Sequence, residues 1–314
     1  MQNLEKWQGL PYHPISLSYK KQFGQKVFKI PVTTAETCPN REGLRGMQTC
    51  NFCDVWGSSA YAEYQEMTLP EQIEKGRARL KNRINVEKFL VYFQAYTTTF
   101  DRVHKMRENF ATAASHSDVV GMVVGTRPDC VSDSLFELWN EYQKTHYVAV
   151  EYGVQTFNEN SLIWMRRGHT AKKSIETIQR TAKACPGMSI GIHLIFGLPD
   201  ERDDEIILAA RLCNTLPIDN VKLHNMHVLK HTPLEQDYKN GLFKPVELEE
   251  YTRRVMLFLD HLDPRISVHR LAAVSSRFDE LIAPAWVMRR MDNYQYMLDQ
   301  MKKTGSYQGR HHNA

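Results

Sequence analysis

Three cysteines lie close together near the start of the chain, at Cys38, Cys50 and Cys53. Thiolates bind soft metals, so this group favours zinc or an iron–sulfur cluster. A structural zinc site needs four ligands, and the nearest histidines in the sequence are His13 and His104. Three thiolates on a four-iron cluster leave one iron free to bind a cofactor. This interpretation accounts best for the number of cysteines.

Two other interpretations of the cysteines stay open. A residue distant in the sequence would complete a zinc site, or Cys50 and Cys53 would form a redox pair without Cys38. A disulfide requires an oxidising compartment, and the N-terminus lacks the charged and apolar regions of a signal peptide. We therefore expect a cytoplasmic protein. The scattered Cys130, Cys185 and Cys213 are expected to be buried structural thiols.

The residues around the cysteines favour a loop that wraps a cluster. Gly43 and Gly46 lie among polar residues between Cys38 and Cys50, a composition that is typical of turns. Phe52 lies inside the Cys50–Cys53 pair. It would either pack the loop or shield the cluster and an adenine ring.

An aromatic residue inside the last cysteine pair, after the strand-like segment 27–32, resembles the signature of radical S-adenosylmethionine (SAM) enzymes. The common signature has three residues between its first two cysteines, whereas eleven separate Cys38 from Cys50. The longer gap resembles the branch that contains the catalytic subunit of Elongator and, more closely, the YhcC-like proteins. The resemblance runs from Phe23 to Gly309.

The resemblance implies both cofactors and a reaction. Cys38, Cys50 and Cys53 would hold a [4Fe–4S] cluster whose open iron binds SAM. One electron from a ferredoxin or flavodoxin would cleave SAM to methionine and a 5′-deoxyadenosyl radical. That radical would abstract hydrogen from a substrate in the mouth of the barrel.

Apolar runs alternate with helical patterns along the chain, which predicts parallel β/α units. Six units predict an α/β fold, a partial (β/α)6 TIM-type barrel with a C-terminal helical extension. The predicted strands are 27–32, 88–93, 119–124, 147–154, 189–196 and 220–227, with a short seventh run at 266–269. The predicted helices are 69–81, 103–114, 133–142, 172–184, 203–212, 247–262 and 285–303.

The chain is expected to divide into three parts: a basic N-terminal segment (1–26), the barrel (27–235) and a C-terminal extension packed on the barrel (236–314). The polar tail that contains His311 and His312 is expected to be disordered.

Polar residues at the predicted strand ends are the candidates for SAM binding, because barrel enzymes place their working residues there. Gln94 and Thr97 offer acceptors for the SAM ammonium group. Asp129 would accept from the ribose hydroxyls, or else cap the next helix. In the families that this chain resembles, a glutamine and an arginine spaced like Gln155 and Arg167 surround SAM. The guanidinium suits a carboxylate, and the amide suits the ribose.

Two residues inside the predicted barrel are catalytic candidates. Glu151 points inward if its strand alternates, and it would be paired structurally or contact the substrate or SAM. His193 lies where related enzymes often have an acidic residue. It would bond SAM, hold the substrate, donate a proton, or be a satisfied core histidine. Lys222, His224 and Met226 share one face of the sixth strand, Leu223, Asn225 and His227 share the other, and either set is a candidate to face the cavity. His269 and Arg270 are further candidates for the cavity.

The formal net charge is +4 and is uneven along the chain. Residues 1–30 hold five Lys and one Glu, and residues 286–314 hold five Lys or Arg and two Asp. Basic ends suggest a polyanion such as RNA, or serve only solubility. No apolar run approaches the roughly 18 residues that cross a membrane, so no membrane association is expected.

The substrate is the least specified part of the prediction. The Elongator-like resemblance points to tRNA, at the side chain on carbon 5 of a wobble uridine. The chain has no counterpart of Elongator's acetyltransferase domain, so acetyl transfer by this chain alone is not expected. The alternatives are a radical SAM enzyme that acts on a small metabolite or cofactor precursor, and a non-catalytic metal-cluster RNA-binding protein.

Overall fold

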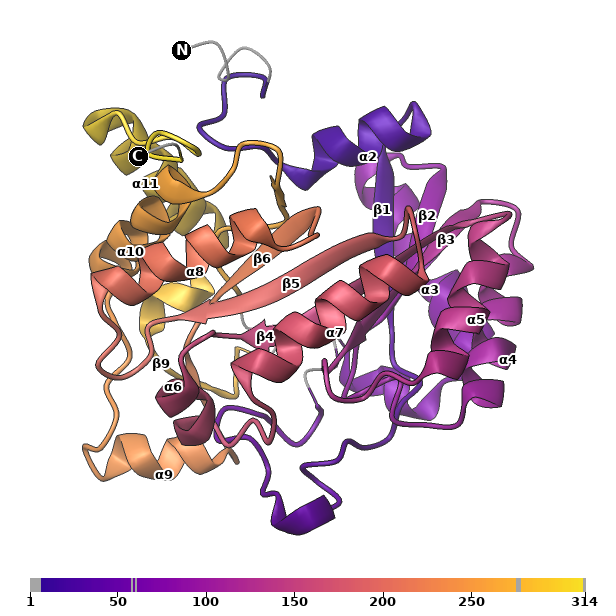
Figure 1. The fold of residues 1–314 in the computed structure, drawn as a ribbon, viewed down its shortest axis with the longest axis horizontal. Coiled ribbons are helices and arrows are strands. Elements are labelled where there is room, and N and C mark those ends of the chain that lie inside the picture. The colour runs from indigo at the N-terminus through magenta and orange to yellow at the C-terminus, as the bar shows by residue number, and fades with distance from the viewer. Residues whose placement is uncertain (1–6, 58, 60, 275–277, 313–314) are drawn as a thin grey trace.

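A single curled sheet of seven parallel strands organises the molecule (Figure 1). The computed structural model describes residues 7–57, 59, 61–274 and 278–312. The strand order β1-β2-β3-β4-β5-β6-β8 follows the chain, and each neighbouring pair is parallel. The sheet is open between β8 and β1. The predicted partial TIM-type barrel is confirmed, with a seventh strand at its edge.

The main sheet contains β1 (Val27–Val32), β2 (Lys88–Phe93), β3 (Val119–Thr126), β4 (Tyr147–Gln155), β5 (Ser189–Phe196), β6 (Asn220–Asn225) and β8 (Ser267–Val268). A two-stranded antiparallel sheet contains β7 (Val228–Leu229) and β9 (Leu281–Ala283). The α-helices are α2 (Ile15–Phe23), α3 (Leu69–Ile84), α4 (Val103–Ala114), α5 (Asp133–Gln143), α6 (Glu159–Trp164), α7 (Ala171–Ala184), α8 (Asp203–Thr215), α9 (Pro233–Lys239), α10 (Leu248–His261) and α11 (Arg290–Thr304).

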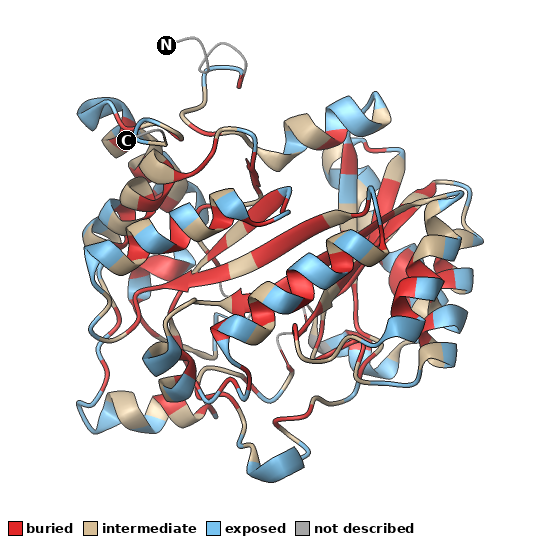
Figure 2. Cartoon of the chain, in the orientation of Figure 1, coloured by how far each residue is buried: buried red, intermediate tan, exposed pale blue. Residues whose placement is uncertain are grey.

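The pattern of burial explains why these segments fold as they do. Strands covered on both faces need continuous apolar runs, and every residue of β2 from Phe89 to Phe93 is buried. The helices bury one stripe only, as α7 does with Ser174, Thr177, Ile178 and Thr181 (Figure 2). No helix in the described part of the chain is both long and apolar enough to span a membrane.

The N-terminal segment, predicted only as basic, forms a helix that closes the N-terminal end of the barrel. Tyr19 of α2 packs with buried Leu90, Val123 and Ala149 from the barrel strands. Just before α2, the carbonyl of His13 accepts a hydrogen bond of 2.7 Å from Val268 N at the open edge of the sheet. The cavity of the barrel is therefore blind at this end.

The prediction of a disordered tail is wrong for the described residues up to His312. Gln308 is completely buried. Its Nε2 donates to the carbonyls of Asp263 and Ile266, at 2.8 and 2.7 Å, and its Oε1 accepts from His13 N at 2.9 Å. This polar tail is held in place by contacts with residues that are far away in the sequence. The local composition of the tail does not predict such contacts.

We expect Gln308→Ala to lower the free energy of unfolding by about 2–4 kcal/mol, because it leaves buried backbone groups without partners. Gln295→Ala is the matched control, since Gln295 is exposed and its side chain donates a hydrogen bond to Asp299 on the helix surface; its effect should stay within about 0.5 kcal/mol. Urea unfolding measures both. Equal losses would contradict the role given to Gln308.

Candidate functional site

One cavity of about 400 Å³ lies at the C-terminal ends of the strands and reaches into the barrel. Nearly all the predicted site residues line it: Cys38, Cys50, Phe52, Cys53, Gln94, Thr97, Glu151, Gln155, Arg167 and His193. Asp129 is not among the lining residues. Segments that are far apart in the sequence thus converge on one cavity, with the cysteines at one end.

The cysteine loop is fastened to the barrel by Asn40, which is buried. Its Nδ2 donates to the carbonyls of Gln48 (2.7 Å) and Arg166 (2.6 Å), and its Oδ1 accepts from Arg127. Gly43 and Gly46 lie at φ of 64° and 75°, a region that favours glycine. The long gap between Cys38 and Cys50 is therefore a folded loop pinned to the segment that carries Arg167.

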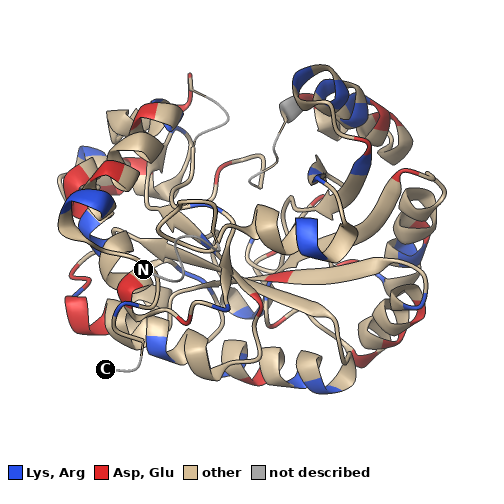
Figure 3. Ribbon diagram, turned by 90° about the horizontal axis from the view of Figure 1, so that it is seen from above, with Lys and Arg blue, Asp and Glu red and all other residues tan. Residues whose placement is uncertain are grey.

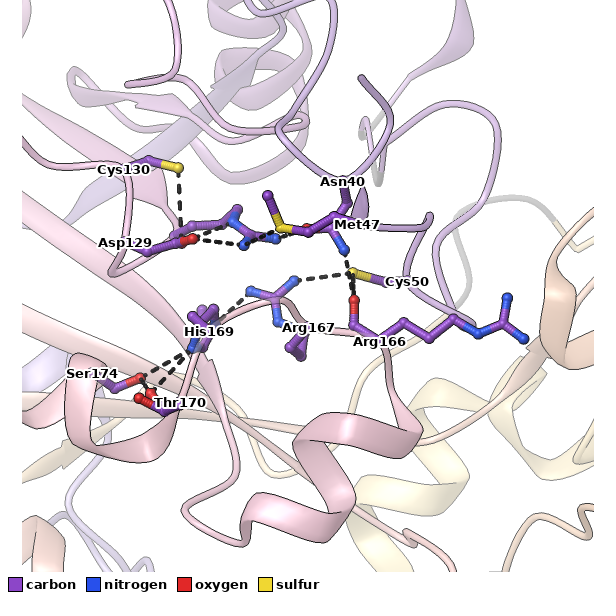
Figure 4. Close-up of polar contacts among 12 residues, drawn as sticks. Asn40, Met47, Cys50, Asp129, Cys130, Arg166, Arg167, His169, Thr170 and Ser174 are labelled. Atoms are coloured by element: carbon purple, nitrogen blue, oxygen red, sulfur yellow. Dashed lines mark hydrogen bonds and ion pairs between the residues drawn. The ribbon is translucent and has the colours of Figure 1, made fainter. Parts of the chain in front are cut away.

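Two arginines lie beside the thiols. Arg167 Nη1 is 3.5 Å from Cys50 Sγ, and its Nη2 donates to the Gly153 carbonyl at 2.9 Å (Figure 4). Arg41 Nη2 is 3.6 Å from Cys53 Sγ. The Nε atoms of Arg41 and Arg167 are buried without a hydrogen-bond partner in the described part of the chain. Unpaired buried donors beside three free thiols fit an anionic cluster with a carboxylate-bearing ligand.

The arrangement does not resemble a site for one metal ion. Within the described residues, no three His, Cys, Asp or Glu side chains are placed to hold a single ion. The three cysteines line one cavity. Three thiolates suit a four-iron cluster with one open iron better than the four-ligand zinc site that the sequence left open.

The strand ends place polar groups around the same cavity. Thr97 is buried, and Gln155 at the end of β4 has φ of 70°, an uncommon conformation for a residue with a side chain. A Cβ on Gly153 would lie 2.8 Å from Gln155 Nε2 and 3.2 Å from Arg167 Nη2. Glycine is therefore needed here for the amide and the guanidinium to lie side by side.

Asp129 contacts a neighbour rather than the cavity. Its carboxylate accepts two hydrogen bonds from Arg127, at 2.9 and 2.8 Å. These bonds lower the pKa of Asp129 despite partial burial. Arg127 itself lines the cavity. The structure thus brings the arginine to the cavity wall and holds the aspartate behind it, and Ser132 rather than Asp129 precedes α5 as its N-cap.

Inside the barrel, six residues form a polar end of the cavity that we call the floor: Tyr92, Glu151, His193, Lys222, His224 and Arg270. Glu151 is its centre. Lys222 Nζ and His193 Nε2 each lie 2.7 Å from Glu151 Oε2. Lys29, behind Glu151, forms an ion pair with Oε1.

The strand register explains how this cluster fits inside the barrel. Glu151 on β4 is flanked by Gly125 on β3 and Gly191 on β5. A Cβ on Gly191 would lie 2.1 Å from Asn220 Oδ1 and 3.3 Å from the Glu151 side chain. A Cβ on Gly125 would lie 3.3 Å from Tyr92 Oη, so the two glycines leave room for the side chains of Tyr92, Asn220 and Glu151. His193 and Lys222 are direct cross-strand neighbours on one face.

Charge pairing fixes the protonation of the floor. Burial alone raises the pKa of Glu151, but Lys222 and Lys29 outweigh it and hold that pKa well below its ordinary value. Burial lowers the pKa of Lys222 to about 7, against the attraction of Glu151. Burial and the charge of Lys222 lower the pKa of His193 to about 4. His193 is therefore neutral near pH 7, with its Nε2–H donated to the carboxylate.

Some floor residues were predictable and others were not. Strand alternation grouped Lys222 with His224 on one of two candidate faces, and the end of the seventh run indicated Arg270. Lys29 was not predicted to lie inside the barrel because it belongs to a mostly apolar strand. The alternation of inward and outward side chains along that strand was the signal that could have found it. Arg127 was not predicted to line the cavity, because the nearby Asp129 is a more familiar type of ribose ligand.

The positions of the charged residues weaken the suggestion that the basic ends of the chain bind RNA. Lys29, counted among the basic residues of the N-terminal part, is inside the barrel. Lys20 and Lys21 lie in the last turn of α2, at the end of the barrel opposite to the cysteine loop. Charged residues otherwise concentrate on the outer helices (Figure 3). Residues 7–26, the described part of the basic N-terminal segment, therefore do not border the cysteine end of the cavity.

Comparison with known proteins places the chain in a family. Residues 32–213 match the radical SAM superfamily, and residues 218–303 match the radical SAM C-terminal domain. Protein YhcC of Escherichia coli K12 is 36% identical over 273 residues, which cover 86% of this chain and 85% of YhcC. A tRNA uridine(34) acetyltransferase of Methanocaldococcus jannaschii is 29% identical over 134 residues, 42% of this chain and 24% of that protein.

The fold has a solved counterpart in Elp3 of Methanocaldococcus infernus, with a TM-score of 0.67 and 16% identity. The match covers 90% of this chain but only 64% of that structure. This likeness supports the fold, whereas the two family matches and the similarity to YhcC support the family. The chain therefore belongs to the radical SAM superfamily, as a YhcC-like enzyme with a fold like that of Elp3 that uses a [4Fe–4S] cluster and SAM.

Proposed function

We propose that this enzyme uses the cavity between the cysteine loop and the floor to abstract a hydrogen atom from a wobble-uridine side chain in tRNA. The observation that carries the proposal is the single cavity that joins the three thiols and Arg167 to the polar floor. The bound cluster and SAM supply a 5′-deoxyadenosyl radical once a ferredoxin or flavodoxin provides an electron. The protein supplies binding, orientation and exclusion of water.

Each SAM contact is assigned to a group of suitable chemistry. Arg167, beside Cys50, binds the carboxylate, and Gln94 and Thr97 accept from the ammonium group. Gln155 binds the ribose in place of Asp129, because Arg127 already occupies the aspartate. Phe52 packs beside the adenine. These assignments follow from the lining of the cavity and the hydrogen-bonding capacity of each side chain.

The floor positions the substrate. Glu151 holds Lys222 and His193 in place, so it acts through them as a positioning residue. With Nε2–H donated to Glu151, His193 has its Nδ1 free to accept a proton from the substrate or to orient a donor. The blind end of the barrel keeps bulk water away from these groups.

The tRNA substrate is supported by the relatives rather than by surface charge. A tRNA uridine(34) acetyltransferase shares 29% identity over 134 residues with this chain. A base must leave its stack to enter a cavity of about 400 Å³, as enzymes that act on bases commonly require. A small metabolite is the second candidate, favoured by the enclosed, polar floor.

The ligand assignment predicts that Cys50→Ala loses the broad visible absorbance of the reconstituted cluster and forms no 5′-deoxyadenosine with SAM and dithionite. Cys130→Ala, which changes a thiol outside the cavity lining, should keep both. Absorption spectra and chromatography of the products measure the two effects. A cluster that survives Cys50→Ala would refute the assignment.

The carboxylate assignment predicts that Arg167→Gln raises the KM for SAM about 10- to 100-fold, the loss expected for charge-assisted hydrogen bonds. The adjacent Arg166→Gln is the control, because its side chain is exposed and extends away from Cys50 (Figure 4). Steady-state formation of 5′-deoxyadenosine gives both constants. An unchanged KM in the Arg167 variant would remove this residue from the SAM site.

The tRNA proposal predicts a changed wobble-uridine nucleoside in total tRNA from a strain that lacks this gene. Liquid chromatography with mass spectrometry of the digested tRNA detects the change. Wild-type protein should restore the nucleoside and the Cys50→Ala variant should not. An unaltered nucleoside profile would favour the small-metabolite substrate.

A further inference from the structure

The floor carries more positive than negative groups. Two acidic residues line the described part of the cavity: Glu151 in the floor, and Asp54 beside Cys53. Glu151 is already shared by Lys222, Lys29 and His193. The carboxylate of Glu151 thus faces the amino groups of both Lys222 and Lys29, and the charge of Arg270 comes in addition. Buried charges normally require a partner.

Arg270 is a guanidinium with no carboxylate at ion-pair distance in the described residues. Its backbone carbonyl accepts from Leu223 N at 3.2 Å, which fixes the residue at the level of the floor. Its Nη2 lies 2.8 Å from His224 Nδ1. Its Nε is buried and has no hydrogen-bond partner. A guanidinium offers five donors and does not deprotonate in proteins, so this side chain is held charged and incompletely bonded.

The neighbours of Arg270 cannot neutralise it. His224 accepts from a donor-only group, so it is neutral, and burial and the charge of Arg270 hold its pKa well below the ordinary value. Lys222 lies on the same side of the cavity, with its Nζ 3.2 Å from Tyr92 Oη, and in its protonated form it adds a second cation there. Tyr92 stays protonated, because burial and Glu151 raise its pKa well above the ordinary value. The missing anion must therefore come from outside the described protein groups.

We propose that the floor binds an anionic oxyacid group of the substrate, a carboxylate or a phosphate monoester, through Arg270 with support from Lys222. This inference rests on the proposed function and narrows its substrate to molecules, or modified bases, that present such a group at their buried end. The site is separate from the one assigned to the SAM carboxylate, which lies at Arg167 beside Cys50. In a cavity screened from water, a charge-assisted fork of this kind also rejects the neutral analogue.

The test uses reconstituted enzyme with saturating SAM and no reductant, so that Arg167 is occupied. Sodium acetate and inorganic phosphate are titrated at constant ionic strength against chloride, with acetamide as the neutral match for acetate. We expect acetate or phosphate to raise the midpoint of thermal unfolding in a saturable way, and acetamide to leave it unchanged. The anion that half-saturates the enzyme at the lower concentration shows whether the floor prefers a carboxylate or a phosphate.

Variants locate the effect. Arg270→Gln should raise the half-saturating concentration at least about 10-fold, whereas Arg166→Gln should leave it unchanged. Arg270→Lys keeps the charge without the fork and should give an intermediate value; it replaces the Gln variant if that one fails to bind SAM. Stabilisation by neither anion, or equally by acetamide, overturns the proposal.

Cleavage of SAM by the dithionite-reduced wild type is measured in parallel. If the enzyme cleaves SAM but does not bind either anion, only the proposed oxyacid site is refuted. Absence of cleavage would instead remove the radical function, and the unreduced titration would still report on the floor.

Discussion

The buried carboxylate of Glu151 is the interaction on which the rest of the barrel interior depends. It lies on the central strand β4 and joins Lys29 from β1 at one edge of the open sheet to Lys222 from β6 near the other. His269, just after β8, lies 3.6 Å from the same carboxylate. Because β1 and β8 are not hydrogen-bonded to each other, these side chains link the two edges across the interior. Removal of one partner from a buried ion pair typically costs about 3–5 kcal/mol.

A second constraint acts where the cysteine loop meets the barrel. Asn40 satisfies carbonyls on both sides of the junction and also accepts from Arg127. The loop also docks through buried Asn51, whose N and Nδ2 donate to the carbonyls of Met165 (3.2 Å) and Trp164 (3.0 Å). Arg167 directly follows Arg166, to which Asn40 binds. The long spacing between the first two cysteines gives the chain enough length to reach this contact and return. Floor and loop are thus positioned by separate networks, and the cavity forms between them.

Much of this arrangement was predictable from local patterns. Apolar runs and helical periodicity gave the barrel and most element bounds within a few residues, because each strand and helix buries its own stripe. The cysteine spacing and the polar strand ends gave most of the candidate ligands, and these residues line the cavity. Asp129 was predicted to line the cavity but does not, because Arg127, two positions away, binds its carboxylate. The division into three parts stays a prediction, and β8, beyond residue 235, pairs with the barrel sheet.

The remaining differences share a physical cause. The helix α2 and the tail around Gln308 are stabilised by contacts across most of the chain length, such as the bond from Gln308 to His13. Lys29 points into the barrel because Glu151 lies opposite, not because of its own neighbours in the sequence. Such pairings leave no periodic trace in one sequence. Predictions made from periodicity fail where a single long-range partner decides whether a polar residue is buried.

The bond between Gln308 N and the Pro11 carbonyl, at 2.8 Å, brings the described beginning and end of the chain together. Both lie near the N-terminal ends of the strands, on the side away from the cysteine loop (Figure 1). A tag or a fused domain attached at either end would emerge from this back face. The end of the cavity that the cysteines line would stay clear, so tethered versions of the enzyme can be built without blocking access to it.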